Sequence, residues 1–207
     1  MNMKKYIWGL IATIVALQGC EKLESEGVSF ETQFVDIELN GNAYMSVVLG
    51  EEFVDEGAIA KEGEEEKEVT ISGNVDVNKV GVYELKYSAV NNDGYPGSAT
   101  RTVAVIPAAE GDGVNIAGNY KYNGGSQIAE ITKYAPGFYY MNNIWGPSDV
   151  PCYILTSDGK DLVLPLTNTP FGRVLGSGEL TGNSLALIVS LLDQNGLIDI
   201  PRNWTKQ

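Results

Sequence analysis

Apolar and polar residues alternate with a period of two along much of the chain. The clearest case is residues 83–89, where Tyr, Leu, Tyr and Ala at the odd positions alternate with Glu, Lys and Ser at the even ones. Successive side chains of a strand point to opposite faces, so this pattern predicts a strand with one buried face. Similar short runs, separated by Gly-, Asn- and Asp-rich turns, lie at 35–39, 44–49, 69–72 and 99–106. Short strands at this spacing predict an Ig-like β-sandwich over residues 34–106.

The second half of the chain shows further strand patterns. Its apolar runs, each bounded by turn residues, lie at 138–141, 152–155, 162–166 and 185–192. A transmembrane helix needs about 20 apolar residues, so the run at 185–192 is too short for one and is expected to be a core strand. Residues 114–207 are therefore predicted to form a second antiparallel β-sandwich or a barrel-like domain. The fold class is all-β, and residues 107–113, rich in Gly, Ala and Pro, are predicted to link the two domains.

The first twenty residues follow a different pattern. Two lysines precede an apolar run over residues 6–17, which is too short to span a membrane and is typical of a secretory signal. The run ends in Leu-Gln-Gly-Cys, a lipobox in which the thiol of Cys20 is acylated and the residues before it are removed. We therefore predict a lipoprotein signal peptide over residues 1–19 and an acidic tether over residues 20–33. An ordinary cleaved signal peptide with an incidental cysteine is the alternative.

Lipid on Cys20 would fix the location of the mature protein, because two or more acyl chains anchor a protein stably in a membrane. Glu21 follows the cysteine in place of the Asp that favours retention in the inner membrane, so we expect the outer membrane. The acidic residues 21–26 resemble the export signals of surface lipoproteins of the Bacteroidota, which implies that the protein faces the cell exterior. A solvated tether explains the same charges equally well.

Composition narrows the functional classes. The net charge is −13, and the chain contains no His. A chain this acidic repels nucleic acid, so no nucleic-acid partner is expected. Residues 30–106 carry 15 acidic and 5 basic side chains, whereas residues 114–207 carry 7 and 6. This change in charge density supports the division into two domains.

Cysteine chemistry is limited as well. Lipidation of Cys20 leaves Cys152 alone in the mature chain, so neither an internal disulfide nor a Cys/His zinc site is expected. Cys152 lies in an apolar, strand-like run and is interpreted as a small buried hydrophobic residue. No cofactor is predicted.

The first predicted domain carries four motifs in the order of a bacterial Ig-like family. They are GEEFVDEGA at residues 50–58, GVYELKY at 81–87, NDG at 92–94 and TRTV at 100–103. Over about residues 35–106 the chain therefore resembles a family of Ig-like domains that recurs in bacterial surface proteins and in an insecticidal crystal toxin. The resemblance implies a spacer or adhesion module without a conserved catalytic site.

The second predicted domain has a resemblance of its own. Its motifs are G-x-Y at residues 118–120, I-x-x-I-T-K at 128–133 and G-F-Y-Y at 137–140. This order is similar to that of C-terminal modules of lipoproteins encoded beside glycan-uptake systems. The similarity implies, by association, that the module captures a polysaccharide or contacts an outer-membrane uptake complex.

The sequence offers little catalytic chemistry. Without His, a Ser-His-Asp or Cys-His triad is excluded. A glycosidase needs two carboxylates, but the acidic residues concentrate in the predicted Ig-like domain and its loop at residues 62–66. That loop is interpreted as solvated, with a weak Ca²⁺ site as the alternative. We therefore predict that the protein is not an enzyme, and a carboxylate-only hydrolase is the less favoured hypothesis.

Aromatic residues of the second domain are better functional candidates, because rings stack on the C–H faces of sugars and amides bond sugar hydroxyls. The candidate ligand-binding residues are Tyr139, Tyr140, Asn142, Asn143 and Trp145. Neighbouring residues of a strand face opposite ways, so one of the two tyrosines is expected to be exposed. Trp145, which precedes a Gly-Pro turn, is expected to be exposed as well. The alternative is that these rings pack beneath a long loop.

The sequence therefore favours a non-enzymatic outer-membrane lipoprotein in which an Ig-like spacer presents a β-rich module. That module is predicted to bind a glycan or a glycan-uptake partner. A structural or adhesive surface protein that makes only protein–protein contacts is the alternative.

Overall fold

The regular structure of residues 32–207 consists of β-strands. The computed structural model describes residues 32–207, and its elements there agree with the predicted all-β class. The predicted signal peptide, Cys20 and most of the predicted tether lie outside the described residues. Residues 33–207 form a single structural unit. No helix in residues 32–207 is both long enough and apolar enough to cross a membrane.

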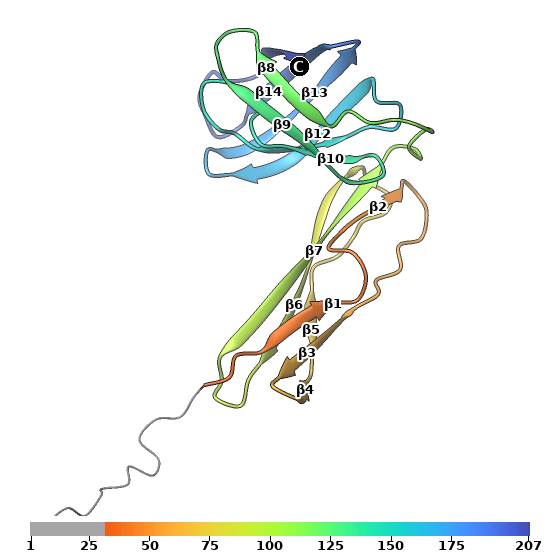
Figure 1. Ribbon diagram of the computed structural model, residues 1–207, viewed down its shortest axis with the longest axis vertical. Helices are drawn as coiled ribbons and strands as arrows, with labels where there is room; N and C mark the ends of the chain where they lie inside the picture. Colours follow the sequence, from red (N-terminus) through yellow and green to blue (C-terminus); the bar gives the residue numbers. More distant parts are fainter. Residues whose placement is uncertain (1–31) are drawn as a thin grey trace, which may run out of the picture. The chain divides into compact units, whose positions relative to one another are not determined.

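The N-terminal part of this unit contains two small sheets (Figure 1). One has the strand order β1-β3-β4 and the other the order β2-β7-β6-β5. The strands are β1 (Asp36–Leu39), β2 (Tyr44–Val48), β3 (Ala58–Glu62), β4 (Glu65–Lys67), β5 (Thr70–Ser72), β6 (Gly81–Val90) and β7 (Pro96–Ile106). Paired strands are antiparallel except for β2 and β7, which run parallel. The two sheets make up the predicted Ig-like region.

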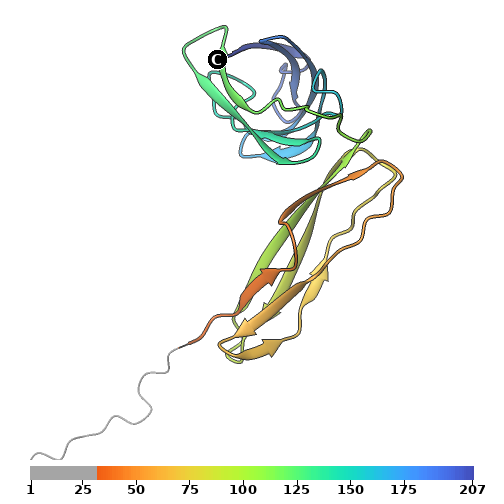
Figure 2. The ribbon, with the colours of Figure 1, turned by 45° about the vertical axis from the view of Figure 1, so that its right-hand side comes forward.

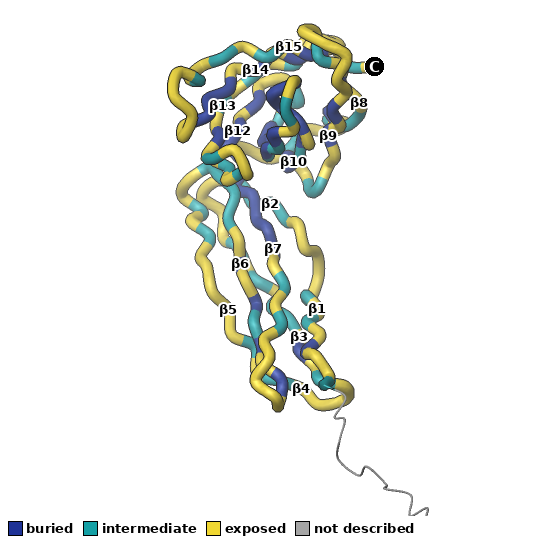
Figure 3. Tube along the Cα trace, turned by 90° about the vertical axis from the view of Figure 1, so that its left-hand side faces the viewer, coloured by how far each residue is buried: buried dark blue, intermediate teal, exposed yellow. Residues whose placement is uncertain are grey.

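The burial of side chains along the two long strands of this region, β6 and β7, can be compared with their sequence patterns. In β6, Leu85 and Tyr87 are buried, whereas Glu84 and Lys86 are exposed, as the alternation predicts. In β7, residues 101–106 are buried without interruption (Figure 3). Because side chains alternate along a strand, continuous burial means that both faces of this end of β7 are covered.

Three residues of the family motifs, Asp55, Tyr87 and Arg101, meet in a buried polar node. The Arg101 side chain is fully buried, and its Nη1 pairs with Oδ1 of Asp55. The Tyr87 hydroxyl donates to the same carboxylate oxygen at 2.5 Å and accepts from Arg101 Nη1 at 3.0 Å. Arg101 also donates to the backbone carbonyl oxygens of Asn40, Asn42 and Gly57. In this structure these motif residues hold β6, β7 and two loops together.

The C-terminal part is a closed barrel of eight antiparallel strands (Figure 2), so the predicted second domain is a barrel and not a second sandwich. The order around the barrel is β10-β11-β12-β13-β14-β15-β8-β9. The strands are β8 (Gly118–Tyr122), β9 (Ile128–Ala135), β10 (Phe138–Met141), β11 (Cys152–Leu155), β12 (Asp161–Thr169), β13 (Gly172–Thr181), β14 (Ser184–Leu191) and β15 (Ile200–Lys206). Alternate residues point inward and fill the barrel, as Leu185, Leu187 and Val189 of β14 do.

Two glycines allow β13 to approach β14 closely. A Cβ on Gly176 would lie 2.1 Å from the carbonyl oxygen of Ile188, and a Cβ on Gly178 would lie 2.6 Å from that of Ala186. Glycines inside strands permit such close backbone approach and the bending that a barrel needs.

The sandwich and the barrel share an apolar cluster. Ile106, at the end of β7, packs with Phe138 of β10 and Leu155 of β11, and all three are buried. Beside this cluster, Tyr44 of β2 stacks on Tyr134 of β9 with ring centroids 4.0 Å apart. The two parts therefore meet through packed side chains.

The predicted linker, residues 107–113, lies between β7 and β8 and is fastened to the barrel. The carboxylate of Glu110 accepts a hydrogen bond from the Tyr139 hydroxyl and another from Lys133 Nζ, each at 2.5 Å. Burial raises the pKa of Glu110, but the hydrogen bonds from Lys133 and Tyr139 outweigh it and lower the pKa. These contacts hold the segment against the barrel. The domain boundaries at residues 34–106, 107–113 and 114–207 stay a prediction.

Candidate binding site

The five residues predicted to bind ligand come from the end of β10 and the loop after it, and they lie in different environments. Tyr139 and Tyr140 face opposite sides of the barrel wall, as expected for strand neighbours. Tyr139 is fully buried in the barrel core, whereas Tyr140 is partly exposed and lines a cleft outside it. The role of these residues in ligand binding stays a prediction.

The two predicted asparagines make hydrogen bonds within the fold. The buried Asn143 accepts from the backbone N–H groups of Trp145 and Gly146 with its Oδ1, both at 2.9 Å, and its Nδ2 donates to the Gly146 carbonyl at 2.9 Å. Asn142 is exposed, but its Oδ1 accepts the backbone N–H of Glu130 at 2.9 Å. Asn143 therefore shapes the loop, and Asn142 extends the pairing with β9.

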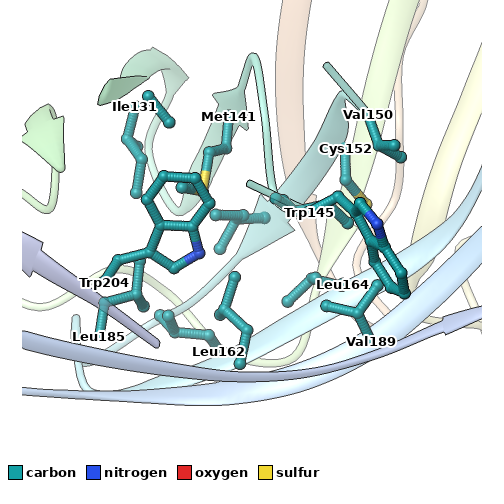
Figure 4. Packing of buried hydrophobic residues seen from close by; sticks show 14 of the residues in the cluster. Ile131, Met141, Trp145, Val150, Cys152, Leu162, Leu164, Leu185, Val189 and Trp204 are labelled. Atoms are coloured by element: carbon teal, nitrogen blue, oxygen red, sulfur yellow. The ribbon is translucent and has the colours of Figure 1, made fainter. Parts of the chain in front are cut away.

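Trp145 is buried, so the expectation of an exposed ring is wrong. It is 9% exposed and belongs to the barrel core, where Figure 4 shows it beside Cys152 and Leu164. The guanidinium of Arg202 covers the ring, with its central carbon 3.6 Å from the ring centroid. The physical reason is that the loop between β10 and β11 folds onto the barrel core. Burial of a large ring there is more favourable than exposure to water.

A cleft with a volume of 610 Å³ lies within the unit of residues 33–207, where barrel and sandwich meet. We call it the tyrosine cleft. Its barrel wall consists of Tyr140, Pro151, Tyr153, Leu166, Thr167 and Asn168. Its sandwich wall consists of Gly73, Asn74, Val82, Tyr83 and Glu84.

Two tyrosine rings dominate the barrel wall. Tyr140 of β10 and Tyr153 of β11 are direct partners in the strand pairing, so their side chains share the outer face of the barrel. Their ring centroids are 5.7 Å apart. Tyr134, which does not line the cleft, stacks on Tyr140 at 5.6 Å with an interplanar angle of 9°. The ring of Tyr140 is thus supported by packing before any ligand binds.

The sandwich wall is built on β6 and the loop after β5. The hydroxyl of Tyr83 donates to the carbonyl of Lys79 at 2.8 Å, which orients the ring. Gly73 has a φ of 102°, and a Cβ there would lie 2.2 Å from the carbonyl oxygen of Glu84. Only glycine therefore lets this loop lie so close to β6. The exposed Asn74 and Glu84 bring an amide and a carboxylate to the same wall.

The tyrosines of the cleft stay neutral at physiological pH. Burial raises the pKa of Tyr83 and of Tyr140 above the ordinary value. Burial, then the Tyr44 hydroxyl and the Glu84 carboxylate, raise the pKa of Tyr153. The hydroxyls of Tyr140 and Tyr153 therefore keep a proton that they can donate, whereas that of Tyr83 is donated to Lys79.

The cleft offers one carboxylate, because Glu84 is the acidic residue among those that line it. Glycoside hydrolysis normally uses a pair of carboxyl groups, so the lining does not provide that arrangement. Within residues 32–207, no group of three or more Cys, Asp or Glu side chains is placed to hold a metal ion. In the acidic loop, Glu62 and Glu65 pair instead with Lys67 at 2.9 and 3.0 Å.

Sequence reasoning found Tyr140 but missed most of the cleft. Tyr153 was not considered as a candidate, although its position next to the inward-facing Cys152 indicates an outward side chain. On β6 the alternation places Glu84 on the exposed face, and that face lines the cleft. No local pattern shows that these two strands approach each other, because their proximity depends on how sandwich and barrel pack.

Comparison with known families identifies the class of the first domain. Residues 37–105 match the family described as "Bacterial surface protein, Ig-like domain". The resemblance inferred from the four motifs is therefore confirmed, and this segment is a bacterial surface Ig-like domain. The match does not extend to the barrel, and no curated protein matches the chain.

Three solved structures show similarity over most of the chain. The lipoprotein BT2262 from Bacteroides thetaiotaomicron aligns over 84% of this chain and 100% of its own, with 23% identity and a TM-score of 0.44. CBM51-2 in complex with GlcNAc and INT domains from Clostridium perfringens ZmpB aligns over 83% and 47%, with 17% identity and a TM-score of 0.32. The M60 catalytic domain with CBM51-1 and CBM51-2 from the same protein aligns over 82% and 22%, with 17% identity and a TM-score of 0.31. Similarity at this level does not indicate what this chain binds.

Proposed function

We propose that this protein is a non-enzymatic, lipid-anchored protein of the bacterial outer membrane that faces the cell exterior and binds a glycan through its barrel. The match of residues 37–105 to a bacterial surface domain supports the surface location. The lipobox at Cys20 supplies the anchor in this proposal.

The observation that carries glycan binding is the barrel wall of the tyrosine cleft. Tyr140 and Tyr153 present neutral rings, and the exposed Asn168 adds an amide beside them. A sugar offers apolar C–H faces and hydroxyl groups, so rings next to small polar groups complement both. The volume of 610 Å³ lies within the range of about 300–1,000 Å³ that is common for ligand pockets.

Binding is testable on a glycan array with residues 20–207 carrying Cys20→Ala. We expect the protein to bind a polysaccharide and the double variant Tyr140→Ala/Tyr153→Ala to lose that binding. Tyr95→Ala is the matched control, because Tyr95 is an exposed tyrosine that does not line the cleft. Equal binding by all three proteins would place the site elsewhere.

The structural or adhesive alternative is favoured by one observation, the match to an Ig-like surface domain, which by itself implies no carbohydrate site. A component of an outer-membrane uptake complex is the protein partner that the sequence resemblance implies. A wild-type protein that binds nothing on the array but captures an outer-membrane protein from the same cells would support this alternative.

A further inference from the structure

We infer that the Ig-like domain forms half of the binding site, and that the ligand is an uncharged sugar chain held between two walls. Asn74 and Glu84 belong to one wall, and Tyr140 and Tyr153 belong to the other. This inference rests on the proposed glycan binding and adds to it the second wall and the class of ligand. In this view the Ig-like domain is more than a spacer.

Both walls are built on regular elements. Tyr83 and Glu84 lie on β6, which pairs with β7 along its whole length. At its C-terminal end, β7 places Ile106 in the apolar cluster shared with Phe138 and Leu155 of the barrel. The distance between the walls is therefore set by packed side chains, and little ordering of the protein is needed when a ligand enters.

The chemistry of the two walls is complementary to one sugar chain. The aromatic surface lies on the barrel wall, where the C–H face of a sugar can stack on Tyr140 and Tyr153, and the outward face of β6 places Glu84 opposite these rings. Polar groups surround the rings, with Asn74 and Glu84 on the sandwich wall and Asn168 on the barrel wall. The Glu84 carboxylate can accept charge-assisted hydrogen bonds from sugar hydroxyls, and these are stronger than bonds between neutral groups.

The negative charge of the cleft and of the whole chain favours an uncharged sugar over an acidic one. Glu84 is the charged residue among those lining the cleft, and the whole chain carries a net charge of −13. A uronic acid or a sulfated sugar would meet a carboxylate inside the cleft and a repulsive field outside it. A neutral sugar chain avoids both penalties.

The test uses a matched pair on one strand. Glu84 and Lys86 are both exposed on the same face of β6, but Glu84 lines the cleft and Lys86 does not. Affinity electrophoresis of residues 20–207 with Cys20→Ala is run in gels containing a neutral β-glucan, a neutral mannan, a polyuronate or a sulfated polysaccharide. We expect retention in a neutral gel, a roughly tenfold loss of affinity in Glu84→Gln, and no change in Lys86→Gln.

Asn74→Ala, in the exposed loop of the sandwich wall, is expected to weaken retention as well. Unchanged retention in the Asn74 and Glu84 variants, with loss in Tyr140→Ala/Tyr153→Ala, would overturn the second wall and leave the proposed function standing. Retention only by charged polysaccharides would overturn the ligand class. Absence of retention in every gel would overturn both this inference and the proposed glycan binding.

Discussion

Arg101 places a charged guanidinium in the interior of the Ig-like domain. It is fully buried, and its partners come from β6 and from two loops of the sandwich. A buried charge is tolerated only when it is paired and hydrogen-bonded. Asp55 supplies the opposite charge, and Tyr87 bridges the two. In this chain the three motif residues therefore have a structural role.

Removal of Asp55 should destabilise the protein strongly. Breaking a buried ion pair by removing one partner costs about 3–5 kcal/mol. We expect Asp55→Ala to lower the free energy of unfolding by about 3 kcal/mol, the lower end of this range, because the Asp55 side chain is 24% exposed. Glu56→Ala, at an exposed neighbour, should change it by less than about 0.5 kcal/mol. Urea melts measure both, and similar small effects would contradict the structural role.

The same carboxylate should make stability depend on pH. Burial raises the pKa of Asp55, but hydrogen bonds from Tyr87 and Gly57 and the charge of Arg101 lower it below the ordinary value of 3.8. A depressed folded-state pKa gives stabilisation that is present above the unfolded-state pKa and is lost as the pH falls through the folded-state value. The stability advantage of the wild type over Asp55→Asn should therefore be constant from about pH 7 to pH 5 and shrink below about pH 4. Urea melts across this range would contradict the assignment if the advantage grew on acidification.

Trp145 is expected to act in the barrel core. Truncation of a buried Trp to Ala costs about 3–5 kcal/mol, so Trp145→Ala should lower the melting temperature markedly. Tyr95→Ala, at a ring that is 52% exposed, should leave stability within about 0.5 kcal/mol of the wild type. Thermal melts compare the two variants. Near-native stability in Trp145→Ala would restore the hypothesis of an exposed stacking platform.

At the scale of the elements, the sequence predicts where a single strand lies and which of its faces is buried. Alternation located β6 and its buried face, and strand parity predicted that Tyr139 and Tyr140 point apart. Closure of the barrel depends instead on β8 pairing with β15, which are far apart in the sequence. No local pattern encodes that pairing, since it is selected by the packing of all eight strands. The burial of Trp145 was missed for a related reason, because an irregular loop has no period to indicate its inner face.

Strand β13 offers a test of barrel packing. Gly176 lies opposite Val189, and a Cβ on it would lie 2.1 Å from the carbonyl oxygen of Ile188. Since neither backbone can move far within a closed barrel, Gly176→Ala should destabilise the protein by about 1–3 kcal/mol, as overpacking does. Ser177→Ala, at the next and exposed position, is the control and should be close to neutral. Urea melts in which the two variants match would argue against this close pairing.

At the scale of the whole molecule, the tyrosine cleft depends on the joint between sandwich and barrel. Its walls carry residues separated by more than fifty positions, such as Tyr83 and Tyr140. The apolar cluster around Phe138 brings these walls together, and the Glu110 hydrogen bonds fasten the segment between the two parts. Neither part alone would form the cleft. The sequence pattern of each domain therefore predicts only Tyr140 as a candidate ligand-binding residue among those that line it.

The location of the whole molecule is predicted to depend on one thiol. The lipobox places acylation on Cys20, so cells fed an alkyne fatty acid should label the wild-type protein and leave Cys20→Ala unlabelled. Cys152→Ala is the matched control, because Cys152 is fully buried and burial raises the pKa of its thiol to about 12, which makes it unreactive. We expect Cys152→Ala to keep its label and to fractionate with the outer membrane. Gel electrophoresis should also show Cys20→Ala at the mass of the unprocessed chain or in the soluble fraction. Label that persists on Cys20→Ala and disappears from Cys152→Ala would contradict the lipobox.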